Sequence, residues 1–243
     1  MTETPFVVDT DAGPIAGHEN GAGAPLLLLH GGPAMTDYME LLGAEVTGWR
    51  AIRYQQRCLS PSATDGPFTV GQHVADAVAV LDALGVDRAI VAGHSWGGHL
   101  ALQLAVAHPD RVAGLLIIDS LGAVGDGGVA EMGQELIARL LPDAVPRFQQ
   151  VAERMSGPDG CDADALESLA RALRDLRVPA IFLPGAQSPM PVSQGEQTAA
   201  LLPASEVVIV PAAGHLPWHE QPGCVADALS RIRNMTGDLE PAG

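Results

Sequence analysis

The sequence predicts an α/β fold, with a mainly parallel sheet covered by helices on both faces. Three observations support this prediction. Short apolar runs alternate with segments of helical periodicity along most of the 243 residues. Each run is rich in Leu, Ile, Val or Ala, as expected for strands buried on both faces. Hydrophobic residues make up 47% of the chain, enough for one large core.

Two antiparallel strands are expected at the start of the chain, followed by six further strands. Phe6–Asn20 is predicted to form two antiparallel strands that turn around Asp11–Pro14. The six further strand candidates are Pro25–His30, Arg50–Gln55, Arg88–Gly93, Val112–Asp119, Pro179–Pro184 and Glu206–Pro211.

Helices are predicted between these strands. The clearest is Val70–Leu84, where apolar residues fall on one stripe and Gly85 follows as a stop signal. His99–His108 and Cys224–Ile232 show the same spacing. One long stretch, Ser120–Arg177, carries no strand candidate and is rich in Ala and Leu. We therefore expect a core of residues 1–119 and 178–243, with residues 120–177 inserted as a short helical cap.

Charge and cysteine content exclude several functions. The 13 basic residues are all arginine, so Schiff-base, pyridoxal phosphate and P-loop lysine chemistry are excluded. A net charge of −16 argues against nucleic acid or anionic lipid as a partner. The three cysteines, Cys58, Cys161 and Cys224, have no metal-site spacing, and we expect no metal or cofactor. The first residues show no basic start followed by an apolar stretch, so we expect no secretory signal, and the longest apolar runs are far short of a membrane span. We expect a cytoplasmic protein.

The strongest chemical signal is the segment Gly93–Gly98, which reads Gly-His-Ser-Trp-Gly-Gly. It follows an apolar strand and runs directly into a helix, the context in which a GxSxG pattern holds a nucleophilic serine on a sharp turn. Ser95 is then exposed at the carboxyl edge of the sheet, beside the backbone N–H of Trp96. The alternative is a tight turn that merely contains a serine.

A second glycine-rich loop, His30–Pro33, follows another apolar strand. Its two glycines, Gly31 and Gly32, let the backbone approach a ligand closely. We expect the N–H groups of Gly32 and Trp96 to form an oxyanion hole, and His30 to brace the loop.

His215 is the best candidate for a base. It follows the last predicted strand, so it lies at the same sheet edge as Ser95. An HxxxH spacing with His219, next to Glu220, would also fit a metal site, but Pro217 interrupts any helix that would align the two histidines.

Together these segments resemble the α/β-hydrolase superfamily, in its proline-iminopeptidase-like and small-esterase branch, over nearly the whole chain. The segments that carry the resemblance are His30–Pro33, Tyr54–Arg57, Gly93–Gly98 and Gly214-His215 with Glu220–Pro222. Gln55 stands where the family usually has an aspartate. The resemblance implies an eight-stranded, mostly parallel sheet with a cap inserted after the sixth strand.

The acid of the triad departs from the commonest family pattern. The position that resembles the usual aspartate is Ser188, which cannot hold an imidazolium by charge. Some relatives place the acid at the end of the strand before the cap, where this chain has Asp119. We expect Asp119 to accept a hydrogen bond from His215 Nδ1. Asp126 is the reserve candidate, and Asp119 acting only as a local cap is the alternative.

A serine, a histidine base and an oxyanion hole together predict acyl transfer to water. His94 replaces the glycine that is usual in proline iminopeptidases, and the cap is shorter than theirs. Hydrolysis of a small-molecule ester or lactone is therefore the preferred interpretation. Candidates for the pocket wall are Gly31, His94, Met190 and Trp218, with ordinary core packing as the alternative.

Three further functions are compatible with these motifs. A cofactor-free oxygenase or a C–C cleaving enzyme would use a His215–Asp119 dyad, with the serine only positioning the substrate. A proline-iminopeptidase-like aminopeptidase would keep the serine as nucleophile. A non-catalytic binding member of the fold would use neither the serine nor the His215–Asp119 dyad for chemistry. The sequence does not determine the oligomeric state.

Overall fold

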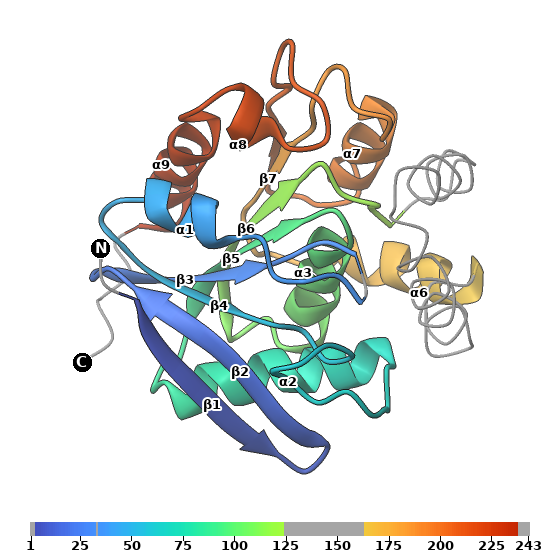
Figure 1. The fold of residues 1–243 in the computed structure, drawn as a ribbon. Helices are drawn as coiled ribbons and strands as arrows, with labels where there is room; N and C mark the ends of the chain where they lie inside the picture. Colours follow the sequence, from blue (N-terminus) through green and yellow to red (C-terminus); the bar gives the residue numbers. More distant parts are fainter. Residues whose placement is uncertain (1–2, 33, 124–162, 238–243) are drawn as a thin grey trace.

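An eight-stranded sheet lies at the centre of the computed structural model, which describes residues 3–32, 34–123 and 163–237 (Figure 1). The strands are β1 (Thr4–Thr10), β2 (Gly13–Asn20), β3 (Ala24–Leu29), β4 (Trp49–Tyr54), β5 (Ala89–His94), β6 (Val112–Ile118), β7 (Ala180–Leu183) and β8 (Ser205–Val207). Their order in the sheet is β1-β2-β4-β3-β5-β6-β7-β8. The pairs β1–β2 and β2–β4 are antiparallel, and the remaining pairs are parallel.

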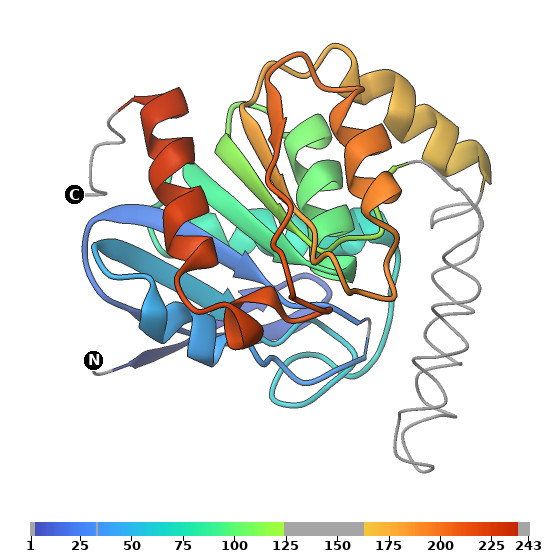
Figure 2. The ribbon, with the colours of Figure 1, turned by 90° about the horizontal axis from the view of Figure 1, so that it is seen from above.

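Helices cover both faces of this sheet (Figures 1 and 2). The helices in the described ranges are α1 (Glu40–Glu45), α2 (Val70–Ala83), α3 (Trp96–Ala107), α6 (Ala163–Leu173), α7 (Val192–Ala199), α8 (Pro217–Glu220) and α9 (Cys224–Thr236). Of these, none is long and apolar enough to cross a membrane.

The core has two halves because alternate strand residues point to opposite faces. Leu27 and Leu29 of β3 pack in one apolar cluster with α2, α3 and α6. Leu26 and Leu28 pack in the other, with α1, α8 and α9. All six residues of β3 are buried, which explains why its sequence is a continuous apolar run rather than an alternating one.

The structure confirms the predicted fold class and the order of strands. β8 is shorter than expected, although Val210 continues its direction through a bridge to Gly185. The predicted helix at Val70–Leu84 is α2, whose first turn is capped by Thr69. The sequence did not predict α1, α7 and α8, which have six, eight and four residues and are too short to show a clear period.

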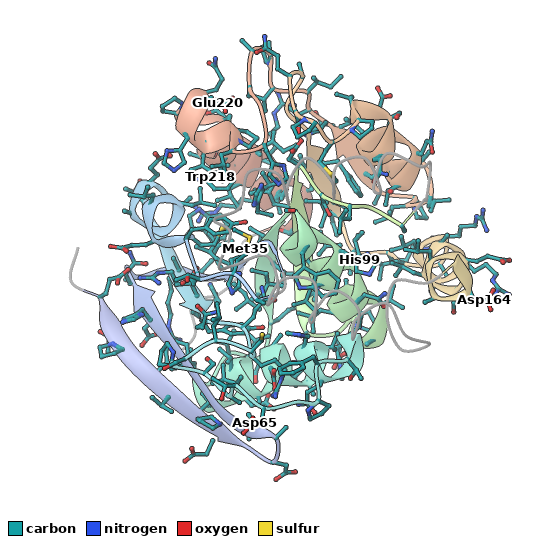
Figure 3. The ribbon with its side chains drawn as sticks, turned by 45° about the vertical axis from the view of Figure 1, so that its right-hand side comes forward. Met35, Asp65, His99, Asp164, Trp218 and Glu220 are labelled. Carbon is teal, nitrogen blue, oxygen red and sulfur yellow. The ribbon has the colours of Figure 1, made fainter. Side chains whose placement is uncertain are left out.

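The predicted cap, residues 120–177, lies between β6 and β7 in the chain, but residues 124–162 are outside the described residues. In the described part, α6 packs Leu169 and Leu173 into the same core cluster as α2 and α3. Figure 3 shows Asp164 of α6 well apart from Trp218 and Glu220 of α8. The division into core and cap therefore stays a proposal.

Candidate active site

Ser95 lies at the turn between β5 and α3. Its φ of 54° and ψ of −120° are unusual for a residue with a side chain. A Cβ on Gly93 would lie 2.1 Å from the Gly97 carbonyl oxygen, and a Cβ on Gly97 would lie 2.1 Å from the Leu29 carbonyl oxygen. Sterics therefore require glycine on both sides of Ser95, and α3 begins one residue after it.

A histidine–aspartate pair lies at the same edge of the sheet. His215 Nδ1 is 2.5 Å from Oδ2 of Asp119, which directly follows β6. The Asp119 side chain is fully buried, whereas the His215 side chain is 29% exposed. Asp119 Oδ1 accepts the backbone N–H of Gly185 at 3.0 Å. A carboxylate can only accept, so His215 carries its proton on Nδ1, and Nε2 is left to receive one.

Ser188 binds the same carboxylate. Its hydroxyl donates to Asp119 Oδ2 over 2.5 Å and accepts the backbone N–H of Met190 over 3.0 Å. The loop after β7 thus supplies a hydrogen bond to an acid that stands at the end of β6. Asp126, the reserve candidate for the acid, lies outside the described residues.

His94 links the serine turn to the His215 loop. His94 Nε2 is 2.6 Å from the His215 carbonyl oxygen, and the two ring centroids are 4.5 Å apart. Among the hydrogen bonds of the described residues, none joins Ser95 Oγ to His215 Nε2. In unliganded enzymes such contacts are often long and shorten when substrate binds.

The loop after β3 lies directly against Ser95. A Cβ on Gly31 would be 2.7 Å from the Ser95 Cβ, and Gly32 has a φ of 64°. The Gly31 N–H donates to the Tyr38 hydroxyl at 2.8 Å. Trp96 is the first residue of α3, so its N–H has no acceptor within the helix. The N–H groups of Gly32 and Trp96 are therefore the candidate donors to an oxyanion.

Side chains of His30 and Gln56 hold the base of this loop. His30 Nε2 accepts the Gln56 N–H at 3.0 Å, which leaves Nδ1 to donate to the Gly31 carbonyl oxygen at 2.9 Å. Gln56 Nε2 donates to the His30 carbonyl oxygen at 2.7 Å. Burial lowers the pKa of His30, so the ring stays neutral and keeps this bracing arrangement.

Gln55 holds the far side of the loop. Its Nε2 donates to the Met35 carbonyl oxygen and its Oε1 accepts the Asp37 N–H, both at 3.0 Å. An aspartate, which is usual at this position in the resembling family, has no N–H group to donate. The glutamine therefore makes both a donor and an acceptor contact where a carboxylate makes only the latter.

A cavity of about 710 Å³ opens beside His215. Its wall is formed by Gln187, Ser188, Pro189, Gly214, His215, Leu216 and Glu220. The predicted pocket residues His94, Met190 and Trp218 are buried and do not belong to this wall. Trp218 packs edge-on against His94, with ring centroids 4.9 Å apart, and Gly31 lies against Ser95 instead.

Among the described residues, the remaining histidines and cysteines do not add a second site. His219 is exposed, while His215 Nδ1 is engaged by Asp119. Within the described ranges, no group of three or more His, Cys, Asp or Glu side chains is placed to hold a metal ion. Cys58 is buried, as expected for a packed thiol.

Tyr38 touches this site and sequence reasoning missed it. Its hydroxyl is 2.5 Å from His94 Nδ1, across 56 residues of chain. A tyrosine ahead of the short helix α1 carries no motif, and only the fold brings it to the serine turn.

Comparisons with known proteins agree with this fold. Residues 24–159 match the family described as alpha/beta hydrolase fold. The chain is 37% identical over 117 residues to a 2-hydroxymuconate semialdehyde hydrolase from Pseudomonas putida. That match covers 43% of this chain and spans 39% of the relative's length.

Solved structures share the fold over nearly the whole chain. A bacterial membrane phospholipase A superposes with a TM-score of 0.81 and 23% identity, covering 98% of this chain and 87% of that one. A proline iminopeptidase from Mycobacterium smegmatis gives 0.71 and 19%, covering 96% and 98%. With the family match over more than half of its residues, the chain belongs to the alpha/beta hydrolase fold family.

Proposed function

We propose that this hydrolase transfers acyl groups from small carboxylic esters or lactones to water, through an acyl-enzyme on Ser95. The observation that carries the proposal is the 2.5 Å contact between His215 Nδ1 and Asp119 Oδ2 beside the Ser95 turn. Activation of a serine hydroxyl needs a base with a free nitrogen that accepts a proton. In the neutral imidazole this contact places the proton on Nδ1, which leaves Nε2 as that nitrogen.

The reaction has two halves. His215 Nε2 takes the Ser95 proton as Oγ attacks the ester carbonyl, and the Gly32 and Trp96 N–H groups bind the developing oxyanion. His215 then protonates the leaving alcohol, and an acyl-enzyme remains. Water attacks this ester with His215 again as base, which releases the acid and restores Ser95.

A second candidate is hydrolysis of a carbonyl compound like the one named for the Pseudomonas relative. A muconate semialdehyde keeps one carboxylate, which an arginine would bind best. The described cavity wall contains no arginine, and Glu220 brings a negative charge instead. The negative charge of Glu220 favours a neutral ester over a substrate that carries a carboxylate.

Labelling with a fluorophosphonate tests the proposed nucleophile. We expect stoichiometric modification of the wild-type chain at Ser95, no modification of Ser95→Ala, and hydrolysis of p-nitrophenyl acetate by the wild type alone. A wild type that neither reacts with the probe nor cleaves esters or lactones would refute the proposal. Turnover of a muconate semialdehyde at a rate well above that of any ester would favour the second candidate.

A further inference from the structure

Three hydrogen bonds connect the oxyanion loop to the backbone of the catalytic histidine. The Gly31 N–H donates to the Tyr38 hydroxyl oxygen at 2.8 Å. The Tyr38 hydroxyl is 2.5 Å from His94 Nδ1, and His94 Nε2 is 2.6 Å from the His215 carbonyl oxygen. The three bonds therefore join three segments at the edge of the sheet: the loop after β3, the end of β5 and the loop that holds His215.

The Gly31 N–H at one end of this series can only donate, and the His215 carbonyl oxygen at the other end can only accept. Each proton in the series can therefore be assigned. The His215 carbonyl oxygen can only accept, so His94 Nε2 carries a proton. In a neutral imidazole Nδ1 is then the acceptor, and the Tyr38 O–H must donate to it. The Tyr38 oxygen still has a lone pair for the Gly31 N–H, which can only donate. Each donor in the series therefore meets an acceptor.

This assignment needs a neutral His94 and a protonated Tyr38. His94 is 1% exposed, and burial followed by the charge of nearby His215 lowers its pKa well below the usual value. Burial raises the pKa of Tyr38 above its ordinary value. Both side chains therefore keep the required protonation state at neutral and mildly alkaline pH.

We propose that Tyr38 and His94 are positioning residues that hold the oxyanion loop and the His215 loop in register around Ser95. This inference rests on the function proposed above. Tyr38 also occupies the Gly31 N–H, so this N–H is not available to the reacting carbonyl oxygen, and the neighbouring Gly32 N–H is the candidate donor. Neither side chain is the nucleophile, the base or an oxyanion donor in the proposed reaction. Both act by holding the backbone of these loops, and the His94 ring also packs against the His215 ring.

The chain has two tyrosines, which provides a matched control. Tyr38 is half-buried and Tyr54 is buried, and the Tyr54 hydroxyl has no hydrogen-bond partner in the described part of the chain. Tyr38→Phe and Tyr54→Phe each remove one hydroxyl group, and only the first breaks this series of hydrogen bonds. Active sites should be counted with the fluorophosphonate so that kcat is expressed per competent enzyme.

With p-nitrophenyl acetate, we expect Tyr38→Phe to lower kcat about 10- to 50-fold and to leave KM within about twofold. This is less than the ~10²- to 10³-fold loss caused by removing an oxyanion donor itself. Tyr54→Phe should match the wild type. A Tyr38→Phe variant whose kcat matches that of Tyr54→Phe overturns the proposal, as does an effect confined to KM or to the number of active sites.

Nitrogen-15 NMR of the histidine rings in the wild type provides a readout that does not depend on activity. The His94 signals are identified by their loss in His94→Gln. We expect a ring protonated at Nε2 and bare at Nδ1 near pH 8, and a ring protonated at Nδ1 would overturn the proposal. If the wild type fails the fluorophosphonate and ester assays, the proposed function is refuted. The NMR measurement still decides whether these three segments are connected as proposed.

Discussion

Replacement of Asp119 by asparagine tests the proposed triad at its most informative point. Asp119 Oδ1 faces the Gly185 N–H, and Oδ2 faces Ser188 Oγ and His215 Nδ1. A backbone N–H can only donate, whereas a hydroxyl can rotate and an imidazole can move its proton. In Asp119→Asn, the amide oxygen should therefore keep the Gly185 bond, and the NH₂ group should face His215.

That orientation of the amide reverses the tautomer of His215. The NH₂ group needs an acceptor, so His215 Nδ1 loses its proton and Nε2 gains one, and the base presents a donor to Ser95. A mis-set tautomer of this kind lowers kcat by about 10⁴-fold, equivalent to about 5.4 kcal/mol of activation free energy. The buried packing is almost unchanged because the two side chains have nearly the same shape.

The assay is steady-state hydrolysis of p-nitrophenyl acetate between pH 6 and pH 9, with thermal unfolding of each variant measured in parallel. We expect kcat to fall about 10³- to 10⁴-fold in Asp119→Asn, with a melting temperature within a few degrees of the wild type. Retention of a tenth or more of the wild-type kcat would show that another group orients His215.

Three further predictions concern other parts of the site and the core. Ser188→Ala removes a charge-assisted hydrogen bond from Asp119, and kcat/KM for p-nitrophenyl acetate should fall about tenfold. Gly97→Ala would bring a Cβ within 2.1 Å of the Leu29 carbonyl oxygen, so chemical denaturation should show a loss of about 4 kcal/mol or more, or no folded protein. Burial lowers the pKa of His73 to about 3 from 6.5, so the unfolded chain binds this proton first and stability falls as the pH drops from about 6.5 towards 3. His73→Phe removes two ring nitrogens that have no hydrogen-bond partner among the described residues, and it should abolish about 2 kcal/mol of the loss between pH 7 and pH 5 in urea unfolding. Equal losses in the variant and the wild type would contradict this.

The sequence predicted those features that depend on local pattern. The continuous apolar run of β3, the early hairpin and the periodic helix α2 each carry their signal within one segment. The turn at Ser95 was predictable because a strand, two obligatory glycines and a helix follow one another directly. The same reasoning put Asp119 and His215 at one sheet edge, because both follow parallel strands.

What the sequence did not predict depends on contacts between distant segments. Tyr38 meets His94 only after β3, β4 and β5 have paired, and no local pattern marks that contact. The pocket is the other example. Aromatic and sulfur-containing residues near motifs were expected to line it, yet Trp218 and Met190 are 1% and 2% exposed. Trp218 packs in the core cluster of α9, and Met190 lines a small cavity beside Asp119. Residue type alone does not distinguish a wall from the packing that supports it.

Ser188 and Asp119 together indicate how the acid can occupy a different strand while the histidine stays in place. Ser188 Oγ is already 2.5 Å from the oxygen that binds His215, so a longer carboxylate side chain at position 188 would reach the same nitrogen. In the double variant Asp119→Asn/Ser188→Asp, the asparagine oxygen would accept the Gly185 N–H and its NH₂ would donate to the new carboxylate. His215 Nδ1 would again face a carboxylate, so we expect kcat to recover at least about tenfold over Asp119→Asn alone. Ser188→Asp by itself should lower activity at neutral pH, because two carboxylates in contact share a proton. A double variant no faster than Asp119→Asn would show that the position of the carboxylate at the end of β6, and not only its charge, is required.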